Sequence, residues 1–173
     1  MPVIRRTPFL LEDVRKELTA DLEQEILDFY AREQVYPEEV ARKRVKRVIC
    51  LLRTPDLGHI IGVTSARLVY VDAMQMHFYA CRGYVSPDYR QKGYFVRAFR
   101  DTVYLLQADF VSGKNTKASG IYISVENPIL KKNHNEYIWW GGDKGEIPYV
   151  FKAYDPKGNH IRLAFFPGVQ LQA

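Results

Sequence analysis

Residues 85–99 read Val85-Ser86-Pro87-Asp88-Tyr89-Arg90-Gln91-Lys92-Gly93-Tyr94-Phe95-Val96-Arg97-Ala98-Phe99, and this stretch decides the fold. The aromatic-rich segment Met76–Val85, which leads into it, is typical of a β-strand. From Phe95 onward, apolar residues recur every three or four positions and predict one buried face of a long helix; they are Phe95, Phe99, Val103, Leu106 and Phe110. The stretch is therefore a junction in which a strand runs through a basic turn into a helix.

The junction has the composition of an anion site. The first backbone N–H groups of a helix have no partner within it, and the helix dipole adds partial positive charge at the same end. Gly93 would let a phosphate approach the backbone closely, and Arg90 and Lys92 add positive charge. The residues alone fit a phosphate-binding turn, but they fit an ordinary strand-to-helix junction as well, because such junctions with one glycine are common.

The order of the other segments predicts the fold class. Before the junction we expect a strand, two helices and a hairpin, at Val3–Arg6, Leu11–Phe29, Pro37–Lys46, and Val48–Leu52 with Ile60–Val71. After the long helix we expect a strand, a short helix and two strands, at Ile121–Val125, Ile129–Trp140, Tyr149–Tyr154 and Ile161–Phe166. This order predicts one α/β (α+β) domain over residues 1–173, with a mixed, mostly antiparallel sheet flanked by helices and one parallel strand-helix-strand crossover.

The composition excludes several classes of protein. A hydrophobic content of 47% in 173 residues is typical of a globular domain with one substantial core. The longest apolar runs fall far short of the roughly 20 residues that cross a bilayer. We therefore expect a cytoplasmic protein without a membrane partner. Cys50 and Cys81 form no disulfide framework, and His59, His77 and His160 have no paired ligand spacing, so we expect no metal.

Positive charge is concentrated in one short segment, at Arg42, Lys43, Arg44, Lys46 and Arg47. Such a run is either a solvated helix face or a surface that binds nucleic acid. The net charge of +5 and the pI near 9.1 favour anionic partners. They do not distinguish a nucleic acid from a phosphate-bearing cofactor.

Several residues of the junction also match a known family signature. Val85, Pro87, Tyr89, Arg90 and Gly93 resemble, in place, the acyl-coenzyme-A signature of the GNAT (general N-acetyltransferase) superfamily, in which a strand ending in Val-x-Pro-x-Tyr runs into Arg/Gln-x-x-Gly-x-Gly/Ala and a helix. The resemblance extends to the hairpin around residues 57–63 and to residues 125–127. It implies a GNAT-like fold over essentially the whole chain.

The resemblance also implies a reaction and a cosubstrate. The expected function is transfer of an acetyl or other acyl group from acyl-coenzyme A to an amine, which a small molecule or a protein would carry. Main-chain amides near Val85 and in the turn would hold the thioester and the pyrophosphate. The implied cofactor-binding residues are Tyr84, Val85, Arg90, Gln91, Lys92, Gly93, Tyr94, Phe95 and Asn127.

Two catalytic residues follow from the same resemblance. Tyr137, with Gly141 four residues later, matches a family tyrosine that protonates the leaving thiolate, although its distance from Asn127 is about one turn longer than usual. His134 is a rival for that role, and core packing beside two tryptophans is the other interpretation of Tyr137. Glu126 could deprotonate the amine through water, or it could simply cap a helix.

Two departures from the family pattern leave alternatives open. Phe95 stands where the family has Gly or Ala, and Tyr79 stands where some members carry a glutamate that acts as general base. The helical periodicity favours an inward Phe95 ring; a ring in the cofactor groove would block binding. The alternatives are a GNAT-like binding or structural module without acyl transfer and a GNAT-fold enzyme that modifies nucleic acid.

Overall fold

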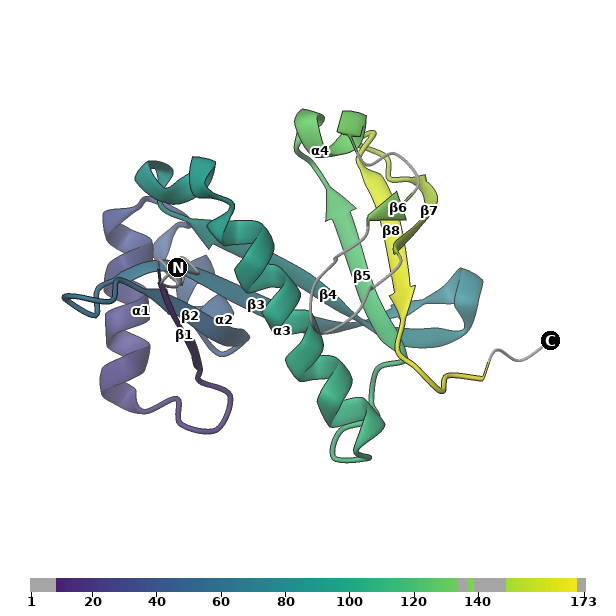
Figure 1. Ribbon diagram of the computed structural model, residues 1–173, viewed down its shortest axis with the longest axis horizontal. Coiled ribbons are helices and arrows are strands. Elements are labelled where there is room, and N and C mark those ends of the chain that lie inside the picture. Colours follow the sequence, from purple (N-terminus) through teal and green to yellow (C-terminus); the bar gives the residue numbers. More distant parts are fainter. Residues whose placement is uncertain (1–8, 134–136, 139–148, 171–173) are drawn as a thin grey trace, which may run out of the picture. The chain divides into compact units, whose positions relative to one another are not determined.

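A computed structural model describes residues 9–133, 137–138 and 149–170 (Figure 1). The chain divides into two compact units. The first contains Met1–Ala66 and Arg82–Thr102, and the second contains Arg67–Cys81 and Val103–Ala173. Two long strands and one helix, β3 (Ile60–Val71), β4 (Met76–Val85) and α3 (Tyr94–Val111), have residues in both units.

The first unit is an antiparallel sheet with two helices beside it. Its further elements are β1 (Leu10–Asp13), α1 (Ala20–Arg32), α2 (Glu38–Val45), β2 (Val48–Arg53) and the 3-10 helix η2 (Pro87–Lys92). Strand β2 pairs antiparallel with β1 on one side and with β3 on the other, and β4 follows β3 in the sheet. Helix α1 lies beside β1 and β2 (Figure 1).

The first helix begins later than its apolar spacing predicts. The expected helix from Leu11 is wrong over its first turns, because Leu10–Asp13 form a strand in which Leu11 lies opposite Leu52. Helix α1 starts after Thr19, whose Oγ1 accepts a hydrogen bond of 3.2 Å from the amide of Leu22. Val14, just after β1, and Ile26 of α1 share one buried cluster, so the apolar spacing marks core positions on both sides of the loop between β1 and α1. The strand expected at Val3–Arg6 lies outside the described residues.

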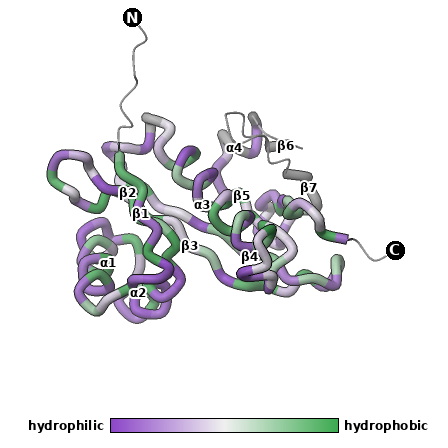
Figure 2. The backbone as a smooth tube through the Cα atoms, turned by 60° about the horizontal axis from the view of Figure 1, so that its bottom comes forward, coloured by the Kyte–Doolittle hydropathy of each residue, from purple (hydrophilic) through white to green (hydrophobic). Residues whose placement is uncertain are grey.

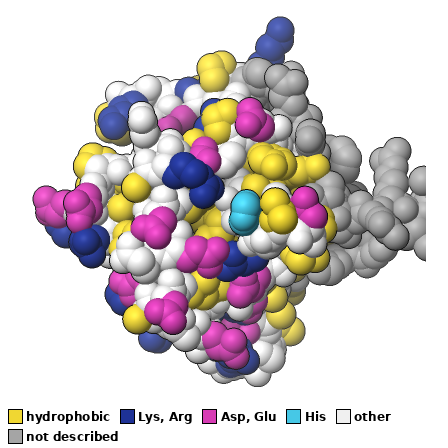
Figure 3. All heavy atoms as spheres, turned by 90° about the vertical axis from the view of Figure 1, so that its left-hand side faces the viewer, with side chains coloured by type: hydrophobic (Ala, Val, Ile, Leu, Met, Phe, Trp, Pro, Cys, Tyr) yellow, Lys and Arg dark blue, Asp and Glu magenta, His cyan; other side chains and the backbone are white. Residues whose placement is uncertain are grey.

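The outer faces of these helices carry paired charges. Arg42 and Lys43 form ion pairs of 2.7 and 2.6 Å with acids one turn earlier on α2, and Lys46 pairs with Glu23 of α1. Arg44 stacks on the ring of Tyr36 at 4.4 Å. Both helices alternate hydrophilic and hydrophobic residues (Figure 2), and acidic and basic side chains are interspersed on the face in Figure 3. Three of the five cations of the basic segment are thus paired with acidic side chains.

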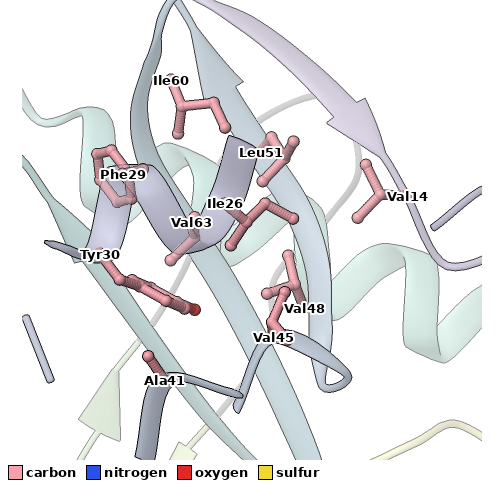
Figure 4. Close-up of a cluster of buried hydrophobic side chains, with 10 residues drawn as sticks. All are labelled: Val14, Ile26, Phe29, Tyr30, Ala41, Val45, Val48, Leu51, Ile60 and Val63. Atoms are coloured by element: carbon pink, nitrogen blue, oxygen red, sulfur yellow. The ribbon is translucent and has the colours of Figure 1, made fainter. Parts of the chain in front are cut away.

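The core of the first unit lies between these helices and the sheet (Figure 4). Helix α1 contributes Ile26, Phe29 and Tyr30, and each of these side chains is at most 1% exposed. Helix α2, the strands β2 and β3 and the residue after β1 complete the cluster with Val14, Ala41, Val45, Val48, Leu51, Ile60 and Val63. Burial of this apolar surface is the main stabilising contribution to the unit.

The second unit contains the parallel crossover. Its further elements are η1 (Asp72–Met74), β5 (Gly120–Val125), α4 (Pro128–Asn133), β6 (Tyr137–Ile138), β7 (Tyr149–Tyr154) and β8 (His160–Phe165). After α3, β5 pairs parallel with β4 at Tyr79 with Ile121 and Ala80 with Tyr122. Strand β8 pairs antiparallel with both β5 and β7, and β6 pairs with β7. The predicted mixed sheet with one parallel strand-helix-strand crossover is confirmed.

The short helix after β5 ends earlier than predicted. The expected helix Ile129–Trp140 is wrong beyond Asn133, because Tyr137 and Ile138 pair with Val150 and Tyr149 as a strand. An aromatic and a β-branched residue in succession favour extended backbone when a partner strand is present. Tyr137 therefore stands on a strand and not on a helix. Trp139 and Trp140 lie outside the described residues.

We expect Ile26→Ala to lower the free energy of unfolding by about 2–5 kcal/mol, because it leaves a cavity in the α1 cluster. The matched control is Leu57→Ala, at a side chain that is 68% exposed, where we expect a change within about 0.5 kcal/mol. Urea unfolding measures both. Equal effects at the two positions would contradict this placement of the core.

Candidate functional site

The turn between β4 and α3 depends on one left-handed residue. Pro87 begins the 3-10 helix η2, where its fixed φ suits a first turn, and η2 ends at Gly93 with φ of +71°. Helix α3 then begins at Tyr94. Gly93 is exposed, and no atom lies within 4 Å of the position that a Cβ would occupy. The backbone at Gly93 is therefore accessible to a ligand.

Aromatic packing anchors the first turn of α3. Tyr94 is 8% exposed and lies 5.2 Å from the ring of Phe9 and 6.1 Å from that of Tyr89. The amide of Arg97 donates to the carbonyl of Gly93 at 3.2 Å. The amides before Arg97 belong to the open end of the helix, which favours an anion.

Phe95 packs against the strand that precedes the turn. A Cβ on Gly83 would lie 2.8 Å from Cε2 of Phe95, so the ring covers the position where other residues carry a side chain. The ring also stacks on Phe99 at 5.7 Å and packs on the cluster that contains Tyr94 and Val85. This is the inward placement that the helical periodicity predicts. The missing side chain at Gly83 accommodates the bulk at position 95.

The other predicted residues of this turn have separate surroundings. Tyr84 packs on Phe29, with ring centroids 6.0 Å apart. Arg90 is exposed, yet its Nε donates to the carbonyl of Val85 at 2.9 Å. Gln91 and Lys92 form the last turn of η2. All the predicted residues from Tyr84 to Phe95 therefore belong to the first unit, although their side chains contact different neighbours.

The remaining predicted residues belong to the second unit. Glu126 and Asn127 follow β5 directly and are both exposed. The carbonyl of Asn127 accepts a hydrogen bond of 3.0 Å from the amide of Lys131, which starts α4. Tyr137 stands on β6, whereas His134 and Gly141 lie outside the described residues.

Hydrogen bonds from the turn between β7 and β8 hold the segment that carries Glu126 and Asn127. The carboxylate of Asp155, in the turn between β7 and β8, accepts hydrogen bonds from the amides of Lys157 and Asn159 and from the hydroxyl of Ser124. Lys131 of α4 donates to the carbonyl of Gly158 in the same turn at 3.0 Å. The turn therefore holds the chain both before and after residues 125–127. These bonds, that from the Asn159 amide first, lower the pKa of Asp155.

Neither cysteine is suited to covalent catalysis. Burial raises the pKa of Cys50 to about 11, and it also raises the pKa of Cys81. Both thiols are therefore protonated at neutral pH. Within residues 9–133, 137–138 and 149–170, no three His, Cys, Asp or Glu side chains form a metal-binding group. In the same part of the chain, no helix is long and apolar enough to cross a membrane.

We expect the costs of Phe95→Ala and Gly83→Ala not to add. The first change removes a partly buried ring, at roughly 3 kcal/mol, and the second adds a methyl group against that ring, at roughly 1–3 kcal/mol. The double variant should lose at least about 1 kcal/mol less than the sum, because the smaller residue 95 makes room for the methyl group. Ile26→Ala with Gly83→Ala is the additive control. Additivity in both pairs would show that Phe95 does not cover Gly83.

Asp155 should titrate below the ordinary aspartate value of 3.8. Its folded pKa is lowered, so its stabilising contribution is complete above the unfolded pKa and is lost as the pH falls through the folded pKa. The difference in unfolding free energy between wild type and Asp155→Asn should therefore shrink as the pH falls from about 5 to about 2. A difference that is constant over this range would contradict the hydrogen-bonded carboxylate.

Comparison with solved structures identifies the fold. No protein-family model and no curated protein matches the sequence. Among solved structures, the chain is similar to an acetyltransferase of the GNAT family from Streptococcus pneumoniae, with 12% identity over 90% of this chain and 96% of that chain and a TM-score of 0.51. It is also similar to Tetrahymena GCN5, with 13% identity over 96% of this chain and 100% of that chain and a TM-score of 0.51. The chain has the fold of the GNAT acetyltransferases.

Proposed function

We propose that the protein is an N-acyltransferase that moves an acetyl or related acyl group from acyl-coenzyme A to an amine. The observation that carries the proposal is the junction of β4, η2 and α3, where the left-handed Gly93 leaves the backbone open beside the N-terminus of an 18-residue helix. The fold similarity to the GNAT acetyltransferase from Streptococcus pneumoniae supports it.

In this proposal, main-chain groups bind the acyl donor. The pyrophosphate lies against the amides of Gln91 to Phe95, where the helix dipole and the absent side chain at Gly93 favour a close anion. The N–H of Val85 binds the thioester arm. The family resemblance separately assigns a cofactor contact to Asn127. No step requires a metal ion from the protein, because the thioester is itself the activated group.

The chemistry is direct attack by a neutral amine. The amine nitrogen forms a bond to the thioester carbonyl carbon, and the carbon–sulfur bond then breaks. The departing thiolate takes up a proton, and the attacking amine loses one. The family resemblance assigns these two proton transfers to the phenol of Tyr137 and, through water, to Glu126. Positioning of the reactants and stabilisation of the oxyanion by main-chain N–H groups supply most of the rate enhancement. The acceptor is an amine on a small molecule or a protein.

One observation favours the second candidate, a binding or structural module with the same fold. Tyr79 occupies the strand position at which some family members carry a catalytic carboxylate, and it pairs with Ile121 of β5 as an ordinary strand residue. The third candidate, action on nucleic acid, rests on the basic segment at residues 42–47, in which Arg42, Lys43 and Lys46 are paired with Glu38, Glu39 and Glu23. Binding and turnover of acetyl-CoA distinguish the first two candidates.

We expect Gly93→Asp to weaken acetyl-CoA binding at least tenfold, about 1.4 kcal/mol, in isothermal calorimetry. The new side chain adds a negative charge where the pyrophosphate would lie, and aspartate tolerates left-handed backbone better than most residues. The matched control is Gly113→Asp, just after α3. Gly113 has φ of +73° and nothing within 4 Å of its Cβ position, so strain and charge are the same.

The control variant should bind acetyl-CoA as the wild type does. Equal affinities in the two variants would exclude the turn as the anion site. Binding without acetyl transfer to any of a panel of primary amines would favour the second candidate. Absence of wild-type binding would contradict the proposed function.

A further inference from the structure

The peptide group that joins Val85 to Ser86 is held at both of its ends. The N–H of Ser86 donates to the carbonyl of Ile61 on β3 at 2.9 Å. Every described peptide bond is trans, so the carbonyl of Val85 points in the opposite direction, away from β3. There it accepts the Nε–H of Arg90 at 2.9 Å. Arg90 thus fixes the one end of this peptide group that β3 does not reach.

The preceding peptide group is oriented by the close approach of β3. The carbonyl oxygen of Tyr84 lies 2.8 Å from the position of a Cβ on Gly62, so this carbonyl faces β3. The N–H of Val85, in the same trans peptide group, therefore points away from β3, toward the edge at which Arg90 sits. If the proposed function holds, this N–H is the donor to the thioester arm.

The position of the Arg90 guanidinium fits this structural task. Its Nε–H is directed at Val85, and its central carbon lies 5.0 Å from the centroid of the Tyr84 ring. Tyr84 in turn packs on Phe29 of α1. The side chain therefore folds back over the two residues before the turn. A cation that served mainly to bind phosphate would instead extend toward the open backbone at Gly93.

We infer that Arg90 is a positioning residue of the acyl-donor site, which acts through the carbonyl of Val85 and not as a phosphate-binding cation. The inference rests on the proposed function. It assigns the recognition of the pyrophosphate to main-chain amides. It also assigns to Arg90 the orientation of the chain between the strand end and Gly93.

Two substitutions separate the donor from the charge. In Arg90→Gln, the amide Nε2 stands the same number of bonds from the backbone as Nε of arginine, so a donor to Val85 is kept while the charge is lost. Arg90→Met has similar length but neither donor nor charge. Both are made at an exposed position, where substitution has little effect on folding.

The experiment titrates both variants with acetyl-CoA in a calorimeter at about 50 mM and about 500 mM salt, since the higher concentration screens exposed charges. At high salt we expect Arg90→Gln to bind within about twofold of wild type and Arg90→Met to bind roughly fivefold more weakly, which is the size of one hydrogen bond. An Arg90→Gln variant as weak as Arg90→Met, with a shallower salt dependence than wild type, would overturn the inference. If Arg90→Met does not fold, the affinity of Arg90→Gln at high salt is the test. Binding within about twofold of wild type would support the positioning role, and weaker binding would overturn it.

A second measurement separates this inference from the proposed function. Without ligand, amide hydrogen exchange in residues 85–93 should be faster in Arg90→Met than in wild type and unchanged in Arg90→Gln. If the wild type does not bind acetyl-CoA, the proposed function fails, and the exchange rates still test Arg90. Equal exchange in the two variants would overturn the positioning role.

Discussion

The packing of α3 on the end of β4 is the constraint on which the candidate site depends. Phe95 can lie against the strand only because position 83 has no side chain, since a Cβ there would stand 2.8 Å from the ring and 3.1 Å from the carbonyl oxygen of Val63. With Phe95 placed, the next residue back, Tyr94, enters the cluster with Phe9 and Tyr89. Gly93 is then left at the surface. One close contact thereby sets the direction in which the helix presents its first amides.

Much of the fold could be predicted because its signals are local. The long helix and β4 are predicted to within a residue, since their apolar periodicity and the Ser86-Pro87 break act within a few positions of the chain. The apolar spacing predicts a single helix over Leu11–Phe29, because spacings of three and four also arise when a strand and a helix contribute to the same core. The pairing of Leu11 with Leu52 depends on residues about 40 positions apart, and no local pattern contains it.

The candidate site was predictable in position but not in the roles of its residues. The glycine and the basic residues of the turn indicate an anion-binding site, and in the structure the backbone at Gly93 is open to solvent. The role of Arg90 depends on the direction of one carbonyl group, which follows from the pairing of Ser86 with Ile61 and not from composition. Gly83 did carry a signal, because a glycine inside a strand often marks a close approach by another group.

The same reasoning bears on the two departures from the family signature. A donor site built from main-chain N–H groups depends on backbone directions, to which the close approaches at Gly62 and Gly83, the left-handed Gly93 and the bond from Arg90 to Val85 contribute. Phe95 is compatible with such a site because its ring is directed at Gly83. Tyr79 stands on β4 where some family members carry a carboxylate, and it lies outside the turn formed by residues 84–93. The difference from the family signature at residue 79 therefore affects the group available for proton transfer. The difference at residue 95 affects the packing of the helix on the strand. Neither change removes a group that the acyl donor would bind.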